Sequence, residues 1–149
     1  MKLRNAPDFA EKAAQWFSDK WGIPFEVYLD SMHECIAQKS SIPQWYIVMG
    51  NDGQIIGGAG VIENDFHDRK DLSPNVCALF VEEEHRNQGI AKHILRSIQN
   101  DIENMGVHAL YLVTDIVGFY EKSSWSFRGM VNGDDGAAMR MYVSSSLSV

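Results

Sequence analysis

The apolar positions of this chain change their period at residue 89. Before it, residues 76–81 form an apolar run that is too short for a typical helix, and this run predicts a buried strand over residues 75–82. After it, apolar side chains recur at steps of three and four residues on one helical face: Ile90, Ala91, Ile94, Leu95, Ile98, Ile102 and Met105. Gly106 is a natural C-terminal cap, so a helix is predicted over residues 89–105. A strand, a tight turn and a helix therefore follow one another.

The remaining elements are predicted in the same way. They are helices over residues 8–21 and from about residue 24, strands over 44–49 and 54–62 joined by an Asp-Gly turn, a strand over 108–114, a short helix over 117–123, and strands over 125–131 and 136–143. Three glycines in the second strand predict a bulge or a close approach by another backbone: Gly57, Gly58 and Gly60. The strand-helix-strand crossover requires two parallel strands, whereas the hairpins are antiparallel. We therefore predict an α/β fold (α+β mixed sheet) that is mostly antiparallel, with one parallel pair and helices on both faces.

Length and composition indicate one folded domain. The chain has 149 residues, of which 45% are hydrophobic and 22% are charged, and we place the domain at residues 1–143. The Ser-rich segment 144–149 is expected to fray. No apolar stretch approaches the ~20 residues that span a bilayer, and the N-terminus lacks a hydrophobic signal segment. We therefore expect a soluble, cytoplasmic protein with no membrane partner.

Charge and metal-ligating residues weigh against two further classes. A net charge of -7 disfavours nucleic-acid binding, which depends on neutralising phosphates, so no nucleic-acid partner is expected. The two cysteines and five histidines show no metal-ligand spacing, so no metal is expected.

The turn between the strand and the helix is suited to bind an anion. It reads Glu84-His85-Arg86-Asn87-Gln88-Gly89-Ile90-Ala91. The first turn of a helix leaves backbone N–H groups unpaired, and the helix dipole adds partial positive charge there. Gly89 lets the backbone approach a phosphate, and Arg86 adds a permanent cation. The glycine-rich loops of dinucleotide-binding folds and of nucleotide triphosphatases are both absent.

Two segments resemble one family. The spacing Arg-x-x-Gly-x-Ala resembles the acyl-CoA pyrophosphate loop of the GNAT superfamily of acetyl-CoA-dependent N-acetyltransferases. Residues 112–125 resemble a second GNAT segment, in which a Phe-Tyr-Glu-Lys helix precedes a small residue, a glycine and an aromatic residue. Here Ser124 stands where glycine is usual, and we expect it to change the backbone of this turn. The resemblance implies a GNAT-like architecture in which the two parallel strands splay apart to hold CoA.

The resemblance also implies roles for individual residues. Acetyl-CoA would be the acyl donor, with its pyrophosphate held by Arg86 and by the backbone amides of Asn87, Gln88, Gly89, Ile90 and Ala91. Its pantetheine arm would pair with Leu79, Phe80 and Val81, and the N–H of Leu79 or a neighbour would point at the thioester carbonyl. Tyr120 would donate a proton to the departing thiolate, for which a phenol that stays protonated at neutral pH is suited.

The general base is less well defined. Some histone acetyltransferases of the superfamily have a catalytic glutamate early in the strand before the loop, and Asn75 aligns with it. An amide cannot usefully accept the proton of the amine. We expect the base among Glu63, Asp65 and His67, or no base at all if the amine binds already neutral.

The sequence thus predicts an N-acetyltransferase that moves the acetyl group to a primary amine by direct attack in a ternary complex. The partner would be a small-molecule amine or a peptide amine. Dimerisation is common in the superfamily, so a homodimer is one option, although the sequence points to no interface. The alternative is a non-catalytic acyl-CoA-binding or regulatory module, which Asn75 and Ser124 favour and Tyr120 opposes. An enzyme that uses a longer acyl chain or an alcohol acceptor also remains open.

Overall fold

The computed structural model describes residues 1–144. Its strands are β1 Gln44–Met49, β2 Ile55–Ile62, β3 Asn75–Val81, β4 Tyr111–Thr114, β5 Trp125–Asn132 and β6 Ala138–Ser144. They form one sheet in the order β1-β2-β3-β4-β6-β5, in which β3 and β4 are parallel and the pairs β1–β2, β4–β6 and β5–β6 are antiparallel. This confirms the predicted mixed, mostly antiparallel α/β fold with one parallel pair.

The chain divides into two compact units. The first contains Met1–Val61 and Ala78–Leu95, and the second contains Ile62–Cys77 and the chain from Arg96 onward. The prediction of a single domain over residues 1–143 stays a prediction.

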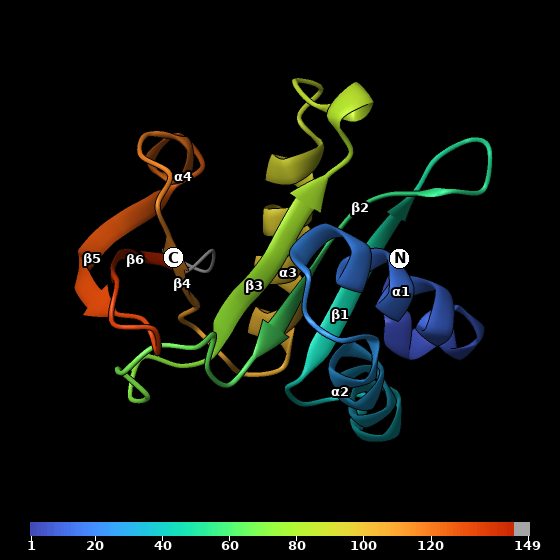
Figure 1. Ribbon diagram of the computed structural model, residues 1–149, viewed down its shortest axis with the longest axis horizontal. Coiled ribbons are helices and arrows are strands. Elements are labelled where there is room, and N and C mark those ends of the chain that lie inside the picture. The colour runs from blue at the N-terminus through green and yellow to red at the C-terminus, as the bar shows by residue number, and fades with distance from the viewer. Residues whose placement is uncertain (145–149) are drawn as a thin grey trace. The chain divides into compact units, whose positions relative to one another are not determined.

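The first unit begins with helices that pack on the hairpin of β1 and β2 (Figure 1). Two 3-10 turns, Leu3–Asn5 and Pro7–Phe9, precede α1 (Ala10–Trp21) and α2 (Phe25–Gln38). As predicted, α1 ends at Trp21, and Gly22 caps it with a φ of 73° and a hydrogen bond from its amide to the Ser18 carbonyl. Phe17 is fully buried, and its ring contacts those of Tyr28 and Trp45. Residues from α1, α2 and β1 therefore share one aromatic core.

Adjacent glycines in β2 show which helix covers each face of the first unit's sheet. A Cβ at Gly57 would lie 3.2 Å from Ile94 of α3 (Ile90–Asn104), and one at Gly58 would lie 2.8 Å from Phe17 of α1. Successive strand residues point to opposite faces, so the two helices cover opposite faces here, as predicted. A Cβ at Gly60 would meet the Trp45 ring at 2.5 Å. At Gly58 the backbone carbonyl of Tyr46 would also lie 2.8 Å from the Cβ, so the predicted close approach by another backbone is found there beside close side chains. The register of β1 and β2 shifts between Val48 and Met49, opposite Gly57, which agrees with the predicted bulge.

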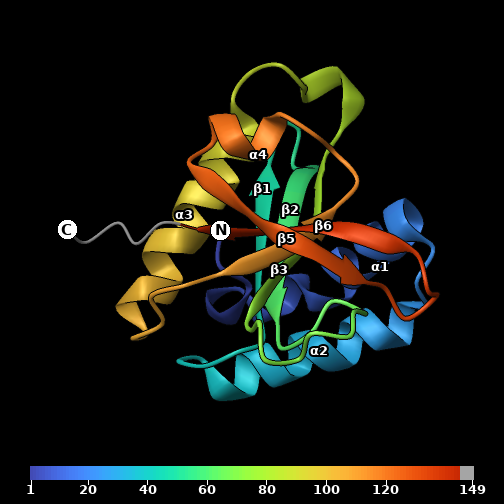
Figure 2. The ribbon, with the colours of Figure 1, turned by 90° about the vertical axis from the view of Figure 1, so that its left-hand side faces the viewer.

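In the second unit, β6 pairs with both β4 and β5 (Figure 2). β6 runs one residue further than predicted, because the amide of Ser144 donates to the Leu110 carbonyl and its hydroxyl accepts from the Leu110 amide, both at 2.9 Å. Ser144 was expected to fray and instead ends a strand. The rest of that segment, residues 145–149, lies outside the described residues.

The turn before β5 corrects one prediction. Helix α4 is short, Phe119–Lys122, and Ser124 follows it with a φ of 70°. We expected the change from glycine to serine to alter this turn. Ser124 instead adopts the left-handed conformation itself, which costs a non-glycine residue about 1–2 kcal/mol.

Candidate functional site

The turn between β3 and α3 gathers backbone amides. A 3-10 turn, Glu83–His85, follows β3, and then Asn87 and Gly89 adopt left-handed φ values of 64° and 80°. Left-handed residues at alternate positions aim neighbouring N–H groups to one side, which makes an anion-binding concavity. The first hydrogen bond of α3 runs from the His93 amide to the Gly89 carbonyl at 3.0 Å. The amides of residues 90–92 therefore have no partner inside the helix and lie at its positive end.

Gly89 leaves this backbone open. A Cβ built on it would have nothing within 4 Å, and the residue is exposed. Its φ favours glycine, and the space that a side chain would fill lies free beside the unpaired amides. The turn therefore fits a pyrophosphate, which needs several N–H donors and close access to the backbone.

Arg86 is held against the end of β3. Its Nε donates to the Val81 carbonyl at 2.8 Å, and its guanidinium carbon lies 5.1 Å from the centre of the Phe80 ring. Within residues 1–144 its two terminal amino groups make no hydrogen bond. The side chain is thus fixed by one nitrogen while its other donors remain available to an anion.

A second irregularity lies inside β3. Ala78 adopts a φ of 55°, whereas an ordinary strand residue has a φ near −120°. Its carbonyl accepts a hydrogen bond of 3.1 Å from the indole Nε1 of Trp21. Leu79 and Phe80, the next two residues, are half-buried. The chain direction therefore changes just before the segment that was predicted to pair with pantetheine.

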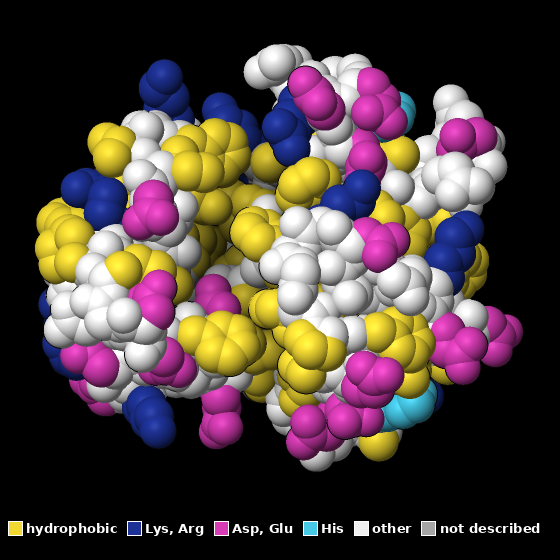
Figure 3. Space-filling view, viewed as in Figure 1, with side chains coloured by type: hydrophobic (Ala, Val, Ile, Leu, Met, Phe, Trp, Pro, Cys, Tyr) yellow, Lys and Arg dark blue, Asp and Glu magenta, His cyan; other side chains and the backbone are white. Residues whose placement is uncertain are grey.

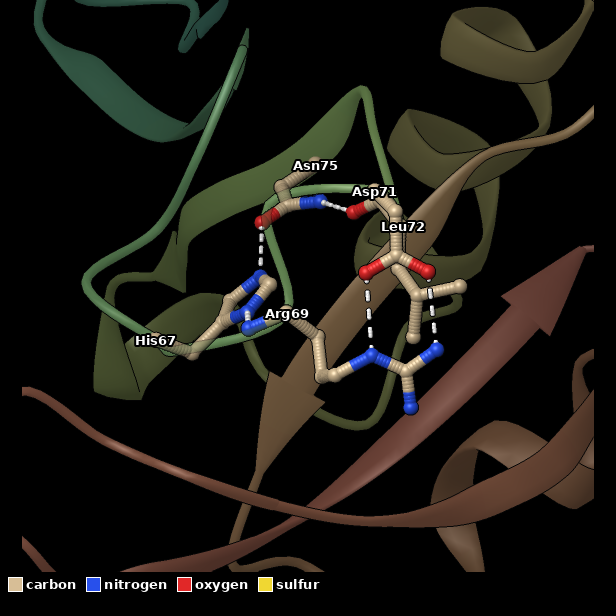
Figure 4. A network of polar contacts seen from close by, with 5 residues as sticks. All are labelled: His67, Arg69, Asp71, Leu72 and Asn75. Carbon is tan, nitrogen blue, oxygen red and sulfur yellow. Dashed lines mark hydrogen bonds and ion pairs between the residues drawn. The ribbon is translucent and has the colours of Figure 1, made fainter.

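In the second unit, side chains hold the turn of residues 64–67, and Figure 4 shows the contact of His67 with Asn75. Asn75 is fully buried, and its Oδ1 accepts from the Asp65 amide at 2.9 Å and contacts Nε2 of His67 at 2.6 Å. Its Nδ2 donates to the Leu72 carbonyl at 2.7 Å. Within the turn, Asn64 exchanges two hydrogen bonds with the backbone of His67, each of 3.1 Å. Asn75, the residue aligned with the glutamate of other enzymes, is thus a structural support for the turn.

Asp65 stands out among the three candidate bases. Its side chain is half-buried, and its carboxylate accepts no hydrogen bond from the part of the chain that the structure describes. Burial raises the pKa of Asp65 to about 6, although the nearby His67 lowers it somewhat. A carboxylate without partners and with a raised pKa is a common property of catalytic acids and bases.

The other two base candidates differ from Asp65. His67 is fully buried, and both ring nitrogens are used, because Nδ1 accepts from the Arg69 amide at 3.1 Å while Nε2 contacts Asn75. Glu63 is exposed, and its carbonyl accepts from the Ser73 hydroxyl at 2.8 Å. The ring of His67 is therefore committed to the turn.

Tyr120 lies in α4 with a buried ring. Its ring centre is 4.9 Å from that of Phe119 and 5.6 Å from that of Tyr142. Burial, and to a smaller extent Tyr142, raises the pKa of Tyr120 to about 12. The phenol therefore stays protonated throughout the neutral pH range.

Glu121, the neighbour of Tyr120, holds the short helix in place. It accepts from the Tyr142 hydroxyl at 2.6 Å and from the Gly118 amide at 2.8 Å. The hydrogen bond from Tyr142 is the main reason that the pKa of Glu121 is lowered. Arg140 completes the group, since its Nε donates to the Tyr142 hydroxyl at 2.9 Å.

Acidic and basic side chains are intermixed with hydrophobic ones on the face in Figure 3.

Across residues 1–144, no three His, Cys, Asp or Glu side chains come together in a way that could hold a metal ion. No helix of the described chain has both the length and the apolar character needed to cross a bilayer.

A family model decides the identity of the fold. The model of the acetyltransferase (GNAT) family matches residues 10–125, well over half of the chain. The chain belongs to the GNAT acetyltransferase family. The resemblance inferred from the two sequence segments is thereby confirmed.

Solved structures share the fold of this GNAT chain at low sequence identity. An aminoglycoside 6′-acetyltransferase type Ii superposes with a TM-score of 0.69 at 16% identity, covering 95% of this chain and 92% of its own. A spermidine N-acetyltransferase variant from Vibrio cholerae gives 0.59 at 15% identity, covering 82% and 75%. A GNAT acetyltransferase from Elizabethkingia anophelis with acetyl-CoA bound gives 0.56 at 18%, covering 75% and 82%. No curated protein matches the sequence of this chain.

The predicted site residues of this GNAT chain fall into two groups. The first unit brings together β3 residues 79–81 and the turn of residues 86–91, and the second contains the turn of residues 63–67 and Tyr120. The sequence predicted neither the left-handed conformation of Ala78 nor the hydrogen bond that Trp21 donates to its carbonyl. No local signal marks them, because alanine does not favour positive φ and a tryptophan at the end of a helix usually belongs to the core.

Proposed function

We propose that this GNAT protein is an N-acetyltransferase that moves an acetyl group from acetyl-CoA to a primary amine by direct attack in a ternary complex. The observation that supports this most is the turn of residues 86–91, where unpaired amides, an open Gly89 and an anchored Arg86 fit a pyrophosphate. Acetyl-CoA, when bound, supplies a thioester activated toward amines.

The backbone provides the donor side of the proposed site. The amides of residues 87–91 and the free donors of Arg86 hold the pyrophosphate, and residues 79–81 pair with the pantetheine arm. The N–H of Leu79 then faces the acetyl carbonyl and stabilises the negative charge that grows on its oxygen during attack. Apart from Arg86, these roles need little from the side chains, and residue 89 is a glycine, so no side chain blocks the backbone there.

Tyr120 supplies the proton donor for the leaving sulfur. As the new N–C bond forms and the C–S bond breaks, its hydroxyl donates to the departing thiolate. Because the pKa of Tyr120 is about 12 and that of a thiol is about 8.5, complete proton transfer is uphill in the free protein. Tyr120 therefore acts first as a hydrogen-bond donor to the thiolate. The thiolate then takes a proton from the Tyr120 hydroxyl, and solvent returns a proton to Tyr120.

Asp65 is the proposed acceptor for the proton that the amine loses. With a pKa of about 6 it is mostly ionised at neutral pH, and it is a stronger base than an ordinary aspartate. His67 and Asn75 hold the turn that presents it. The acceptor would be a small-molecule or peptide amine.

The first test is a calorimetric titration of acetyl-CoA into the purified protein and into a double variant, Arg86→Ala with Gly89→Asp. We expect the variant to bind at least ~100-fold more weakly, because it lacks a cation and has a carboxylate beside the phosphates. Gly53→Asp is the matched control, since Gly53 has a φ of 79° and nothing within 4 Å of a Cβ. Equal binding by the wild type and the double variant would contradict the proposed loop.

The second test measures thiol release from acetyl-CoA with spermidine, an aminoglycoside and a peptide N-terminus as acceptors. Release that depends on the amine, and that falls in Tyr120→Phe, supports the transferase. Saturable binding without release from any acceptor supports a CoA-binding module instead.

A further inference from the structure

The indole of Trp21 is bonded to the peptide group that joins Ala78 and Leu79. Its Nε1 donates to the Ala78 carbonyl at 3.1 Å, and its ring meets the Phe80 ring edge-on at a centre distance of 6.2 Å. Trp21 is the last residue of α1, and Gly22 ends the helix directly after it. The side chain remains 47% exposed. A large, half-exposed indole is thus held over β3 by one hydrogen bond and one ring contact.

The other end of the same peptide group is the N–H of Leu79. A trans peptide group is planar, so its C=O and N–H point in opposite directions. A donor that fixes the carbonyl of Ala78 therefore also fixes the direction of the Leu79 N–H. Hydrogen bonds along such a chain polarise one another, so the bond from Trp21 also makes the Leu79 N–H a stronger donor.

The conformation of Ala78 is one that surrounding contacts must hold. A φ of 55° is unfavourable for alanine, and it turns this peptide group away from the direction of a regular strand. Such residues persist where surrounding contacts hold them. Trp21 provides one of these contacts from outside the strand.

We infer that Trp21 is a positioning residue for acetyl transfer, in which its indole N–H orients and polarises the Ala78–Leu79 peptide group so that the Leu79 N–H binds the acetyl carbonyl. The inference rests on the proposed function, because it assigns Leu79 N–H the acetyl carbonyl as its partner. Trp21 itself touches neither reacting atom.

The same helix contains a matched control. The indole of Trp16 donates to Glu82 at 3.1 Å, and its ring lies edge-on to the Phe80 ring at 5.8 Å. Trp16→Phe and Trp21→Phe each remove one indole N–H and keep an aromatic ring on α1. Only Trp21→Phe removes a bond to the Ala78–Leu79 peptide group.

The experiment compares the wild type with both variants by three measurements. The first is the ¹⁵N shift of the Leu79 amide, which responds to a hydrogen bond on the preceding carbonyl. The second is the infrared carbonyl stretch of bound acetyl-CoA labelled with ¹³C at the acetyl carbonyl. The third is the pair of constants kcat and KM for acetyl-CoA, with thermal unfolding as the check that each variant is folded.

For Trp21→Phe we expect a shifted Leu79 amide, a carbonyl stretch moved toward that of free acetyl-CoA, and kcat lowered roughly fivefold at unchanged KM, because transition-state polarisation is weakened more than binding. Trp16→Phe should leave the amide shift and the carbonyl stretch at their wild-type values. An unchanged carbonyl stretch in Trp21→Phe would overturn the inference even if the wild type transfers acetyl groups. A carbonyl stretch that moves in Trp21→Phe, in a protein that acetylates no amine, would overturn the proposed function and with it the role of Trp21 in acetyl transfer. It would leave only the orientation of the Leu79 N–H by Trp21.

Discussion

Two turns of this protein are built in different ways. The turn of residues 86–91 presents backbone amides, and its side chains from Arg86 to Gly89 are exposed. The turn of residues 64–67 is held by buried side chains, above all Asn75 and His67, which lie eight residues apart in sequence. The first depends on local conformation, and the second depends on partners brought in by the fold. Substitutions should therefore affect binding at the first turn and stability at the second.

The largest effect is expected from Asn75→Ala. The change removes three hydrogen bonds and leaves the Leu72 carbonyl, the Asp65 amide and the ring of His67 without a buried partner. We expect the free energy of unfolding to fall by about 3 kcal/mol or more, measured by urea denaturation. Gln88→Ala removes a similar amide from the exposed turn, and it should change stability by less than about 0.5 kcal/mol. Equal losses in the two variants would contradict the comparison.

Asp65→Asn should change how stability depends on pH. Because the folded pKa of Asp65 is raised from 3.8 to about 6, the native state binds more protons than the unfolded state between these values. The contribution of Asp65 to stability is therefore complete below about pH 4 and is lost as the pH rises through 6. We expect the variant and the wild type to have equal free energies of unfolding at pH 4. At pH 8 the variant should be more stable by up to about 3 kcal/mol, a difference that solvent screening reduces.

Asp68→Asn is the control of opposite sign. A hydrogen bond from the Asn132 amide lowers the pKa of Asp68, so its charge stabilises the native state at neutral pH and this contribution is lost in acid. The variant should be less stable than the wild type at pH 8. If both variants shift in the same direction across the pH series, the assignment of Asp65 is wrong.

A modest effect on stability is expected at Gly89. Gly89→Ala and Gly53→Ala both place a methyl group at a left-handed residue with nothing within 4 Å of it, so each should cost about 1 kcal/mol of stability. The two should differ only in binding, where Gly89→Ala weakens acetyl-CoA about tenfold, or about 1.4 kcal/mol. A calorimetric titration with both variants separates a loop that binds phosphate from one that merely turns the chain.

The sequence predictions succeeded for features that depend on nearby residues and failed for features that depend on distant partners. The helix over residues 89–105 was predicted to within a residue at each end, since its apolar period and its flanking glycines are local. The strand predicted over residues 108–114 begins only at Tyr111, where it pairs with Asn75 of β3. Ser144 belongs to β6 because its amide and its hydroxyl both form hydrogen bonds with the backbone of Leu110. The Ser-rich sequence does not reveal this partner.

The amino-acid sequence alone determined the family, the mixed sheet and the candidate phosphate loop. Each of these depends on short-range information: hydrophobic period, helix capping, and a glycine and an arginine at fixed spacing. The tertiary structure decided that Asn75 supports a turn and that the carboxylate of Asp65 is half-buried with no hydrogen-bond partner among residues 1–144. It also decided that Trp21 reaches the carbonyl of Ala78 across 57 positions of chain. Those properties depend on burial and on contacts between distant residues, because only the folded chain sets which groups lose water and which find a partner.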